Sequence, residues 1–384
     1  GIFKKFLTAC FLFVLYLKAG CADVLQNAPS AEPLFVYEKA ASLTSEDIIK
    51  ASLEFSECPV NSKEAQDVFA QYKILQNQVT SSAFMNLSEA ERAEKILEQI
   101  YSDVLSSYQE MQSKTSEMFF FGRYNCVSSS VLYLALAKAA SLDVRGQRTP
   151  LHAFCTVYIK DGSGGNLTKI DVETTNPMGF NPGTKKNLQA NTTGNKKYAV
   201  VPKKNYSGRK EISDRLFVSL IGRNMATEYD RKGEYFSSVP MSAACLSFVK
   251  DESASVSFAR DDFEKICGNY VVSLHREKNF EKALAWLDYV YEKYGAEGVL
   301  RDSYETTVYN NVVSLCKKGQ FDAARECYKV RASRLSKRRI AQIENNIFNE
   351  DSISLNDLIC NLFKTFLKKG IVSVVCIEAF ASFN

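Results

Sequence analysis

The sequence predicts an α+β fold, in which a helix packs on a small antiparallel sheet and an α-helical repeat domain follows. Residues 44–118 and 126–140 carry apolar residues at helical spacing. The segments LHAFCTVYIK and LTKIDVETT then alternate and are rich in β-branched and aromatic residues, as strands are. A helical pattern repeats in the last part of the chain, and 384 residues are enough for two domains.

The first 21 residues have the pattern of an export signal. Lys4 and Lys5 precede the apolar run FLTACFLFVLYL, which has signal-peptide length and is too short to span a bilayer comfortably. The following LKAGC resembles a bacterial lipobox, which predicts lipidation of Cys21 and a tether over residues 22–43. Cleavage after Ala22 would instead release a soluble protein. We expect an exported protein of the bacterial periplasm or cell envelope, held at the membrane by a lipid anchor if Cys21 is modified.

The composition of the chain argues against nucleic-acid binding and metal binding. The net charge is only +4 and no basic block occurs, so we expect no nucleic-acid partner. Eleven cysteines without a Cys-x-x-Cys pair indicate neither a zinc site nor a disulfide framework, and we expect no metal and no cofactor. The chain has two histidines, His152 and His275, so a histidine-dependent mechanism must use one of them.

Local signals place the elements of the first domain, residues 44–210. Ser88 and Glu91 form a capping-box pattern at the start of a helix, and Asn125 is an N-cap candidate for residues 126–140. That helix is apolar nearly all round, which predicts a central position. We expect SLDVRGQRTP to turn the chain toward the first strand, DGSGG to join the strands, and residues 176–210 to form a long loop.

Three residues in this domain form a candidate catalytic site. Cys126 opens the central helix, His152 lies near the start of the first strand, and Asp171 lies on the second. A helix N-terminus and a neighbouring imidazole both favour a thiolate, which is the nucleophilic form of cysteine. A carboxylate would orient the imidazole, and the Cys126 N–H would be one oxyanion donor. Glu173, two residues farther on the same strand face, is the alternative carboxylate.

The order of these motifs resembles the transglutaminase-like superfamily. A cysteine, an apolar helix, SLDVRGQRTPLHAF and a strand with IDVETT are most similar to a bacterial branch in which this core often precedes tetratricopeptide-like repeats. The resemblance covers roughly residues 88–180. It implies a papain-like core with Cys126 as the nucleophile, His152 as the base and Asp171 as the orienting carboxylate. Phe154 stands where the family commonly has an aromatic residue after the histidine.

The remaining domain, residues 211–384, repeats a pair of helices. VVSLHREKNFEKALAW begins at Val271 and VVSLCKKGQFDAAREC at Val312. The aligned positions are the turns Gly233, Lys278 and Gly319, the aromatics Tyr235, Phe280 and Phe321, and the small residues Ala283 and Ala324. Over residues 213–335 this pattern resembles tetratricopeptide repeats, and an unrelated helical bundle is the alternative.

Together these features predict an exported thiol hydrolase or acyltransferase that acts on an amide or peptide bond. The helical repeats would bind a protein or peptide, as substrate or partner. The alternative is a catalytically inactive transglutaminase-like fold that serves as a protein-binding scaffold. We expect His275 to be a solvated helix-end residue. We expect Cys155, Cys245, Cys267, Cys316, Cys327 and Cys360 to be packed as small hydrophobic residues.

Overall fold

The computed structural model describes residues 27–38, 42–160, 167–184 and 197–345 of the chain. These residues divide into two compact units: the first unit, residues 29–267, and the second unit, which contains residues 27–28 and the residues from 268 onward. The sequence had placed this boundary between residues 210 and 211. Cys21 and the rest of the expected export signal, the DGSGG turn and Cys360 lie outside the described residues.

The first unit begins with a helical layer. Its helices are α2 (Ser45–Phe55), α3 (Lys63–Val79), α4 (Ser82–Met85), α5 (Glu89–Asp103) and α6 (Thr115–Phe121). Ser88 and Glu91 form the predicted capping box at the start of α5. The apolar face of α5 is buried, as predicted, through Ile96, Leu97, Ile100 and Tyr101.

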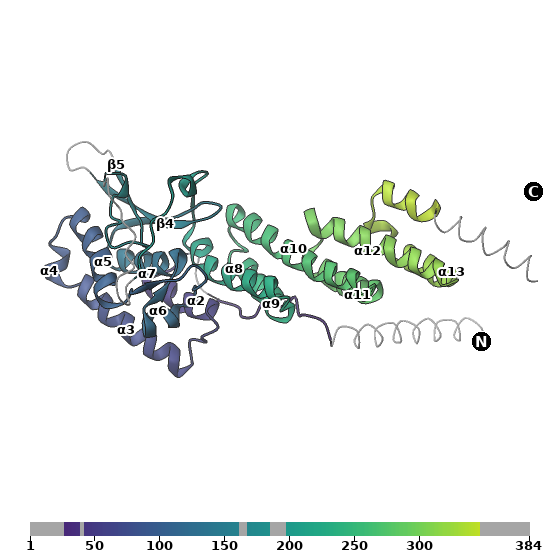
Figure 1. The fold of residues 1–384 in the computed structure, drawn as a ribbon, viewed down its shortest axis with the longest axis horizontal. Helices are drawn as coiled ribbons and strands as arrows, with labels where there is room; N and C mark the ends of the chain where they lie inside the picture. Colours follow the sequence, from purple (N-terminus) through teal and green to yellow (C-terminus); the bar gives the residue numbers. More distant parts are fainter. Residues whose placement is uncertain (1–26, 39–41, 161–166, 185–196, 346–384) are drawn as a thin grey trace, which may run out of the picture. The chain divides into compact units, whose positions relative to one another are not determined.

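Helix α7 (Cys126–Ala139) is the central element of the first unit. It touches α2, α3 and α5, and also three elements that follow it: strands β3 (Asp143–Arg148) and β4 (Ala153–Lys160) and helix α8 (Asp214–Lys232). In Figure 1 the strands lie on one side of α7, and α3 and α6 lie on the other. Every residue from Val127 to Ala137 is buried, which confirms the central position predicted from its apolar composition.

The sheet of the first unit is antiparallel, with the strand order β5-β4-β3-β6. Its strands are β3 (Asp143–Arg148), β4 (Ala153–Lys160), β5 (Leu167–Val172) and β6 (Lys210–Ile212). The structure confirms the two predicted strands as β4 and β5. The prediction that SLDVRGQRTP only turns the chain was wrong, because Asp143–Arg148 pairs with β4 along its whole length. A small parallel pair, β1 (Ser107–Tyr108) with β2 (Arg123–Tyr124), leads into α7.

The chain then returns to helices. Short 3-10 turns at Pro182–Thr184 and Lys203–Tyr206 (η2) interrupt the expected long loop, and β6 follows. Helices α8 (Asp214–Lys232) and α9 (Tyr235–Phe248) pack against each other, and α8 also touches α2, α7 and β3. Gly146 on β3 allows this approach, because an added Cβ would lie 2.4 Å from the Phe217 ring of α8.

Helix α10 (Ser253–Arg276) runs through the boundary into the second unit. The second unit continues with α11 (Phe280–Tyr294), α12 (Gly298–Lys317), α13 (Phe321–Lys329), a 3-10 turn at Ala332–Arg334 and a helical segment over residues 337–345. No helix of the described residues is both long enough and apolar enough to cross a membrane.

The aligned turns of the repeated sequence adopt one backbone conformation. Gly233, Lys278 and Gly319 have φ values of 74°, 57° and 72°, all in the left-handed region that ends many helices. The three aligned aromatics are the first residues of α9, α11 and α13. Ala283 and Ala324 are fully buried, as the prediction of closely packed helices requires. The structure thus confirms paired helices joined by equivalent turns.

Candidate functional site

Cys126 is the first residue of α7 and is half-buried. The side-chain oxygen of Asn125 accepts the N–H groups of Val127 and Ser128 at 3.0 Å each, which confirms Asn125 as the predicted cap. Within the described part of the chain, no acceptor lies at hydrogen-bonding distance from the Cys126 N–H. This N–H therefore remains open at the positive end of the helix dipole.

The Asn125 cap is itself fixed by other segments. Its amide nitrogen donates to the Glu110 carbonyl at 3.1 Å and to the Ser113 hydroxyl at 2.7 Å. The side chain of Asn224, from α8, donates to the same hydroxyl at 2.9 Å. The position of Cys126 is thus set by residues on both sides of the helix start.

His152 lies immediately before β4 and faces both a carboxylate and the thiol. Its Nε2 lies 2.6 Å from Glu173 Oε2, and both side chains are almost fully buried, at 3% and 2% exposure. The imidazole ring stacks on Phe154 with a centroid separation of 5.9 Å. Cys126 also interacts favourably with the charged imidazole, through a side-chain hydrogen bond and through its charge. His152 therefore interacts with both the cysteine and the carboxylate.

The charge of this pair is set by competing effects. Burial lowers the pKa of His152, but hydrogen bonds to Cys126 and Glu173 and the charge of Glu173 outweigh it and raise that pKa to about 10. Burial likewise opposes ionisation of Glu173, whereas His152 and the other donors lower its pKa below the ordinary value. At neutral pH the site therefore holds an imidazolium against a carboxylate.

Within the described residues, four hydrogen bonds hold the Glu173 carboxylate. Besides His152, the Tyr206 hydroxyl donates to Oε2 at 2.6 Å. The N–H and hydroxyl of Thr175 donate to Oε1 at 3.1 Å and 2.8 Å. A buried carboxylate with this many donors stays ionised and keeps one orientation.

The expected carboxylate, Asp171, does not contact His152. In the β4–β5 register Asp171 is opposite Thr156, four residues beyond His152, which corresponds to about 13 Å along a strand. It accepts from Thr156 at 2.7 Å and binds the guanidinium of Arg209 at 2.7 Å and 2.9 Å. The assignment of the orienting carboxylate to Asp171 is therefore corrected to Glu173, the alternative that the sequence left open.

Two residues from the expected loop complete the site. Tyr206, at the end of η2, packs its ring edge-on against His152 and Phe154, with centroids 5.7 Å and 5.2 Å apart. Arg209 lies over the Phe154 ring at 4.8 Å while it binds Asp171. The sequence carried no motif for either residue. The aromatic and the arginine in NYSGRK are the only local signal, and neither has a predictable spatial partner.

A buried group of hydroxyls joins the Glu173 segment to α7. The hydroxyls of Ser129 and Ser130 lie 2.8 Å and 2.7 Å from the Thr174 hydroxyl. Tyr101 donates to the Thr174 carbonyl at 2.8 Å and lies 2.9 Å from the Tyr124 hydroxyl. The helix that starts with Cys126 and the segment that carries Glu173 are thus bonded to each other directly.

The other predicted residues lie elsewhere. His275 was expected to be solvated, but it is half-buried, its Nε2 lies 2.9 Å from the Thr307 hydroxyl, and burial lowers its pKa. Cys155, Cys245, Cys267 and Cys316 are buried as predicted, whereas Cys327 is half-buried. Within the described ranges, no cluster of three or more His, Cys, Asp and Glu side chains could hold a metal ion.

Comparisons with known proteins add little to this geometry. No protein-family model matches the chain, and no curated protein matches it. A solved structure that it resembles is described as the crystal structure of menin, which reveals the binding site for Mixed Lineage Leukemia (MLL) protein. The match has 11% identity and a TM-score of 0.32, and it covers 73% of this chain and 72% of that one. At this TM-score the likeness defines neither fold nor function.

Proposed function

We propose that the first unit is a papain-like thiol enzyme of the transglutaminase-like type, with Cys126, His152 and Glu173 as its catalytic residues. The observation that carries this proposal is the buried His152, whose Nε2 lies 2.6 Å from the Glu173 carboxylate and whose pKa both Glu173 and Cys126 raise. A cysteine that merely fills space needs neither a charged imidazole nor an open helix N-terminus beside it.

The proposed reaction is hydrolysis or transfer of an acyl group from an amide. The Cys126 thiolate attacks the carbonyl carbon, and the Cys126 N–H donates to the oxygen that becomes negative. The His152 imidazolium gives its proton to the leaving amine, which departs as the C–N bond breaks and leaves a thioester. Neutral His152 then takes a proton from water or an acceptor amine, whose attack breaks the C–S bond, releases the acyl group and returns the thiolate and the imidazolium. Glu173 keeps the ring oriented throughout.

Alkylation of Cys126 by iodoacetamide, followed against pH by peptide mass spectrometry, tests the proposal. The wild-type protein should label rapidly at pH 6, and His152→Ala should lose this reactivity by at least tenfold. Cys327 is an internal reference, because it is also half-buried but has Asn311 and Arg331 as partners and burial raises its pKa. If Cys126 does not react, or if its alkylation rate is the same in His152→Ala, the hypothesis of an inactive protein-binding scaffold would be favoured.

We further propose that the helical repeats bind the protein or peptide on which Cys126 acts. The equivalent turns and the buried small residues Ala283 and Ala324 support a stack of paired helices, an architecture that commonly binds proteins. A Cys126→Ala variant of the full chain, cross-linked in cells and analysed by mass spectrometry, should yield partner peptides attached to residues 268–345. Cross-links confined to residues 29–267 would refute this role.

Export and lipid attachment at Cys21 remain proposals that rest on the sequence of the first residues. They predict a mature protein that begins at a diacylated Cys21, detectable by mass and by detergent partitioning. A Cys21→Ala variant should lose the added mass and move to the aqueous phase. An unmodified N-terminus after Ala22 in the wild-type protein would instead support soluble export.

A further inference from the structure

A second group of charged residues lies on the face of the sheet that packs against α8. Arg148, the last residue of β3, is directly opposite Lys210 of β6. Like charges at directly opposite positions destabilise an antiparallel pair. Both cations lie over the same aromatic ring, Phe258 of α10, at 4.9 Å and 5.2 Å from its centroid. Both side chains therefore lie against one ring at the end of the sheet.

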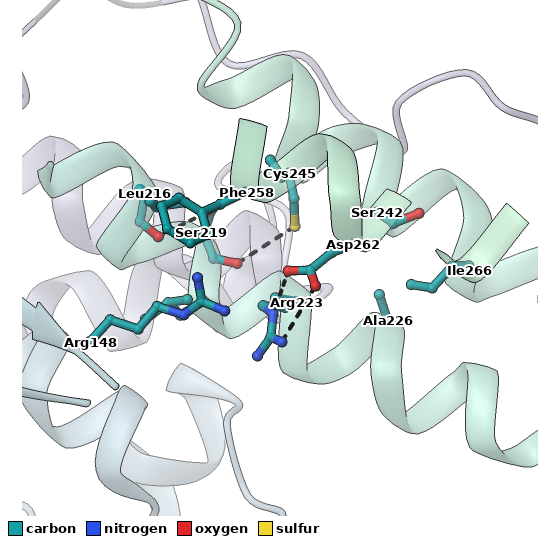
Figure 2. A pocket seen from close by; sticks show the side chains of 12 residues that line it. Arg148, Leu216, Ser219, Arg223, Ala226, Ser242, Cys245, Phe258, Asp262 and Ile266 are labelled. Atoms are coloured by element: carbon teal, nitrogen blue, oxygen red, sulfur yellow. Dashed lines mark hydrogen bonds and ion pairs between the residues drawn. The ribbon is translucent and has the colours of Figure 1, made fainter. Parts of the chain in front are cut away.

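A third cation lies beside Arg148. Figure 2 shows the guanidinium of Arg223, from α8, next to that of Arg148, with Asp262 bonded to Arg223. Asp262 binds Nε and Nη2 of Arg223 at 2.5 Å and 3.4 Å, which leaves the Nη1 group of Arg223 open. Arg148 and Arg223 thus share the Asp262 carboxylate.

The Arg148 guanidinium itself has five N–H donors and no acceptor at hydrogen-bonding distance within the described part of the chain. The side chain is half-buried. Burial and the charge of Arg223 lower its pKa, and Asp262 offsets them only in part. Together with the geometry, this shows a cation that forms no direct ion pair among the described residues.

The neighbouring carboxylates are engaged elsewhere. Glu211, which follows Lys210, accepts from Arg145 at 2.9 Å and also from Tyr158 at 2.5 Å. Glu252 accepts the hydroxyl of Ser213, the N-cap of α8. Among the described residues, neither carboxylate forms an ion pair with Arg148 or Lys210.

We propose that Arg148 and Arg223, assisted by Lys210, form a binding site for a tetrahedral oxyanion of the phosphate class. Such an anion accepts N–H groups from both guanidinium groups, and a dianion would relieve the repulsion between Arg148 and Arg223. The cavity behind them is only about 20 Å³, which is room for one water molecule, so the anion would lie at its open mouth. Arg223 reaches solvent there, with 34% of its side chain exposed.

This site is separate from the candidate catalytic residues. Arg148 is opposite Ala153, and residues directly opposite project to the same face of a sheet. Phe154, on which the His152 ring stacks, is the next residue of β4 and projects to the other face. The proposed oxyanion site can therefore be tested independently of the proposed thiol chemistry.

Thermal unfolding and calorimetric titration of the full chain with inorganic phosphate, at constant ionic strength set by sodium chloride, test the proposal. Phosphate should raise the melting temperature of the wild-type protein and bind with one site. Arg148→Gln should weaken binding at least tenfold. Without phosphate, this variant should melt at the same or a higher temperature than wild type, because it removes a repelled charge.

The matched control is Arg145→Gln on the same strand, whose guanidinium already binds Asp143 and Glu211. Its phosphate affinity should stay within twofold of wild type. Arg148→Lys keeps the charge but loses the fork, and it should bind phosphate more weakly than wild type and more tightly than Arg148→Gln. Sulfate should compete with phosphate, whereas acetate at equal concentration should not. Equal phosphate binding by wild type and Arg148→Gln, or acetate binding as tight as phosphate binding, would overturn the assignment.

Discussion

Replacing Glu173 by glutamine removes the negative charge that faces His152 and leaves the shape of the side chain nearly unchanged. The pKa of His152 should then fall well below about 10, because Cys126 alone would oppose the effect of burial. A fall to the ordinary value of about 6.5 would lower the imidazolium fraction at pH 8 about thirtyfold. The variant should also lose about 3–5 kcal/mol of stability, as expected when one partner of a buried ion pair is removed.

Asp171→Asn is the matched control for Glu173→Gln. It makes the same chemical change two residues earlier on the same segment, but the Asp171 side chain is 30% exposed and pairs with Arg209. An exposed ion pair contributes at most about 1 kcal/mol, and Asp171 lies beyond reach of the imidazole. This variant should therefore leave the pKa of His152 unchanged.

The assay is the pH titration of the imidazole nitrogen and carbon signals by NMR, with urea unfolding measured in parallel. The chain has two histidines, so a His275→Asn variant assigns both signals. A pKa of His152 that stays near 10 in Glu173→Gln, or that falls as far in Asp171→Asn, would refute the reasoning. Those results would return the orienting role to Asp171.

Three further predictions concern the same contacts and the turns of the second unit. Tyr206→Phe keeps the ring packing but removes a hydrogen bond to the Glu173 carboxylate, so urea unfolding should show a loss of about 1.5–3 kcal/mol; an unchanged stability would contradict that bond. Lys278→Gly relieves a left-handed residue with φ of 57° and should gain about 1 kcal/mol in thermal unfolding, whereas Gly319→Ala at φ of 72° should lose a similar amount; equal signs for the two would be the contrary result. The folded-state pKa of His152 lies above its unfolded value of 6.5, so the stability that this residue contributes is complete below pH 6.5 and is lost as the pH rises toward about 10. The free energy of unfolding should fall in this range by at most about 1.4 kcal/mol per pH unit, and His152→Gln should abolish this dependence.

The features that the sequence predicted correctly depend on short stretches of chain. Asn125 caps α7 through the N–H groups two and three residues ahead, so the cap and the start of the helix can be recognised locally. The turns at Gly233, Lys278 and Gly319 were found because the same pattern repeats along the chain. Lys278 shows the strength of that alignment, since lysine by itself gives no signal for a left-handed turn.

The features that the sequence missed depend on strand register. Asp143–Arg148 is a strand with polar and charged residues at alternate positions and a glycine at its centre, and such a segment is difficult to distinguish from a turn. When β3 and the β4–β5 register are unknown, Asp171 and Glu173 cannot be distinguished, because residues two apart project to the same face of a strand. The β4–β5 ladder ends at the Cys155–Val172 pair, so the next residue, Glu173, lies at the end of the sheet near His152, whereas Asp171 lies farther along β4 opposite Thr156.

The buried serines of α7 connect the core of the first unit to the candidate site. Ser129 and Ser130 are fully buried in a helix that otherwise packs by apolar contacts, and an unbonded buried hydroxyl would destabilise the fold. Their shared partner is the hydroxyl of Thr174, the residue next to Glu173. If the Glu173 segment left its place, it would break the contact with His152 and leave these serines without that partner. The hydroxyls therefore couple the integrity of the core to the position of the carboxylate, and they hold the His152–Glu173 pair against the cost of burying two charges.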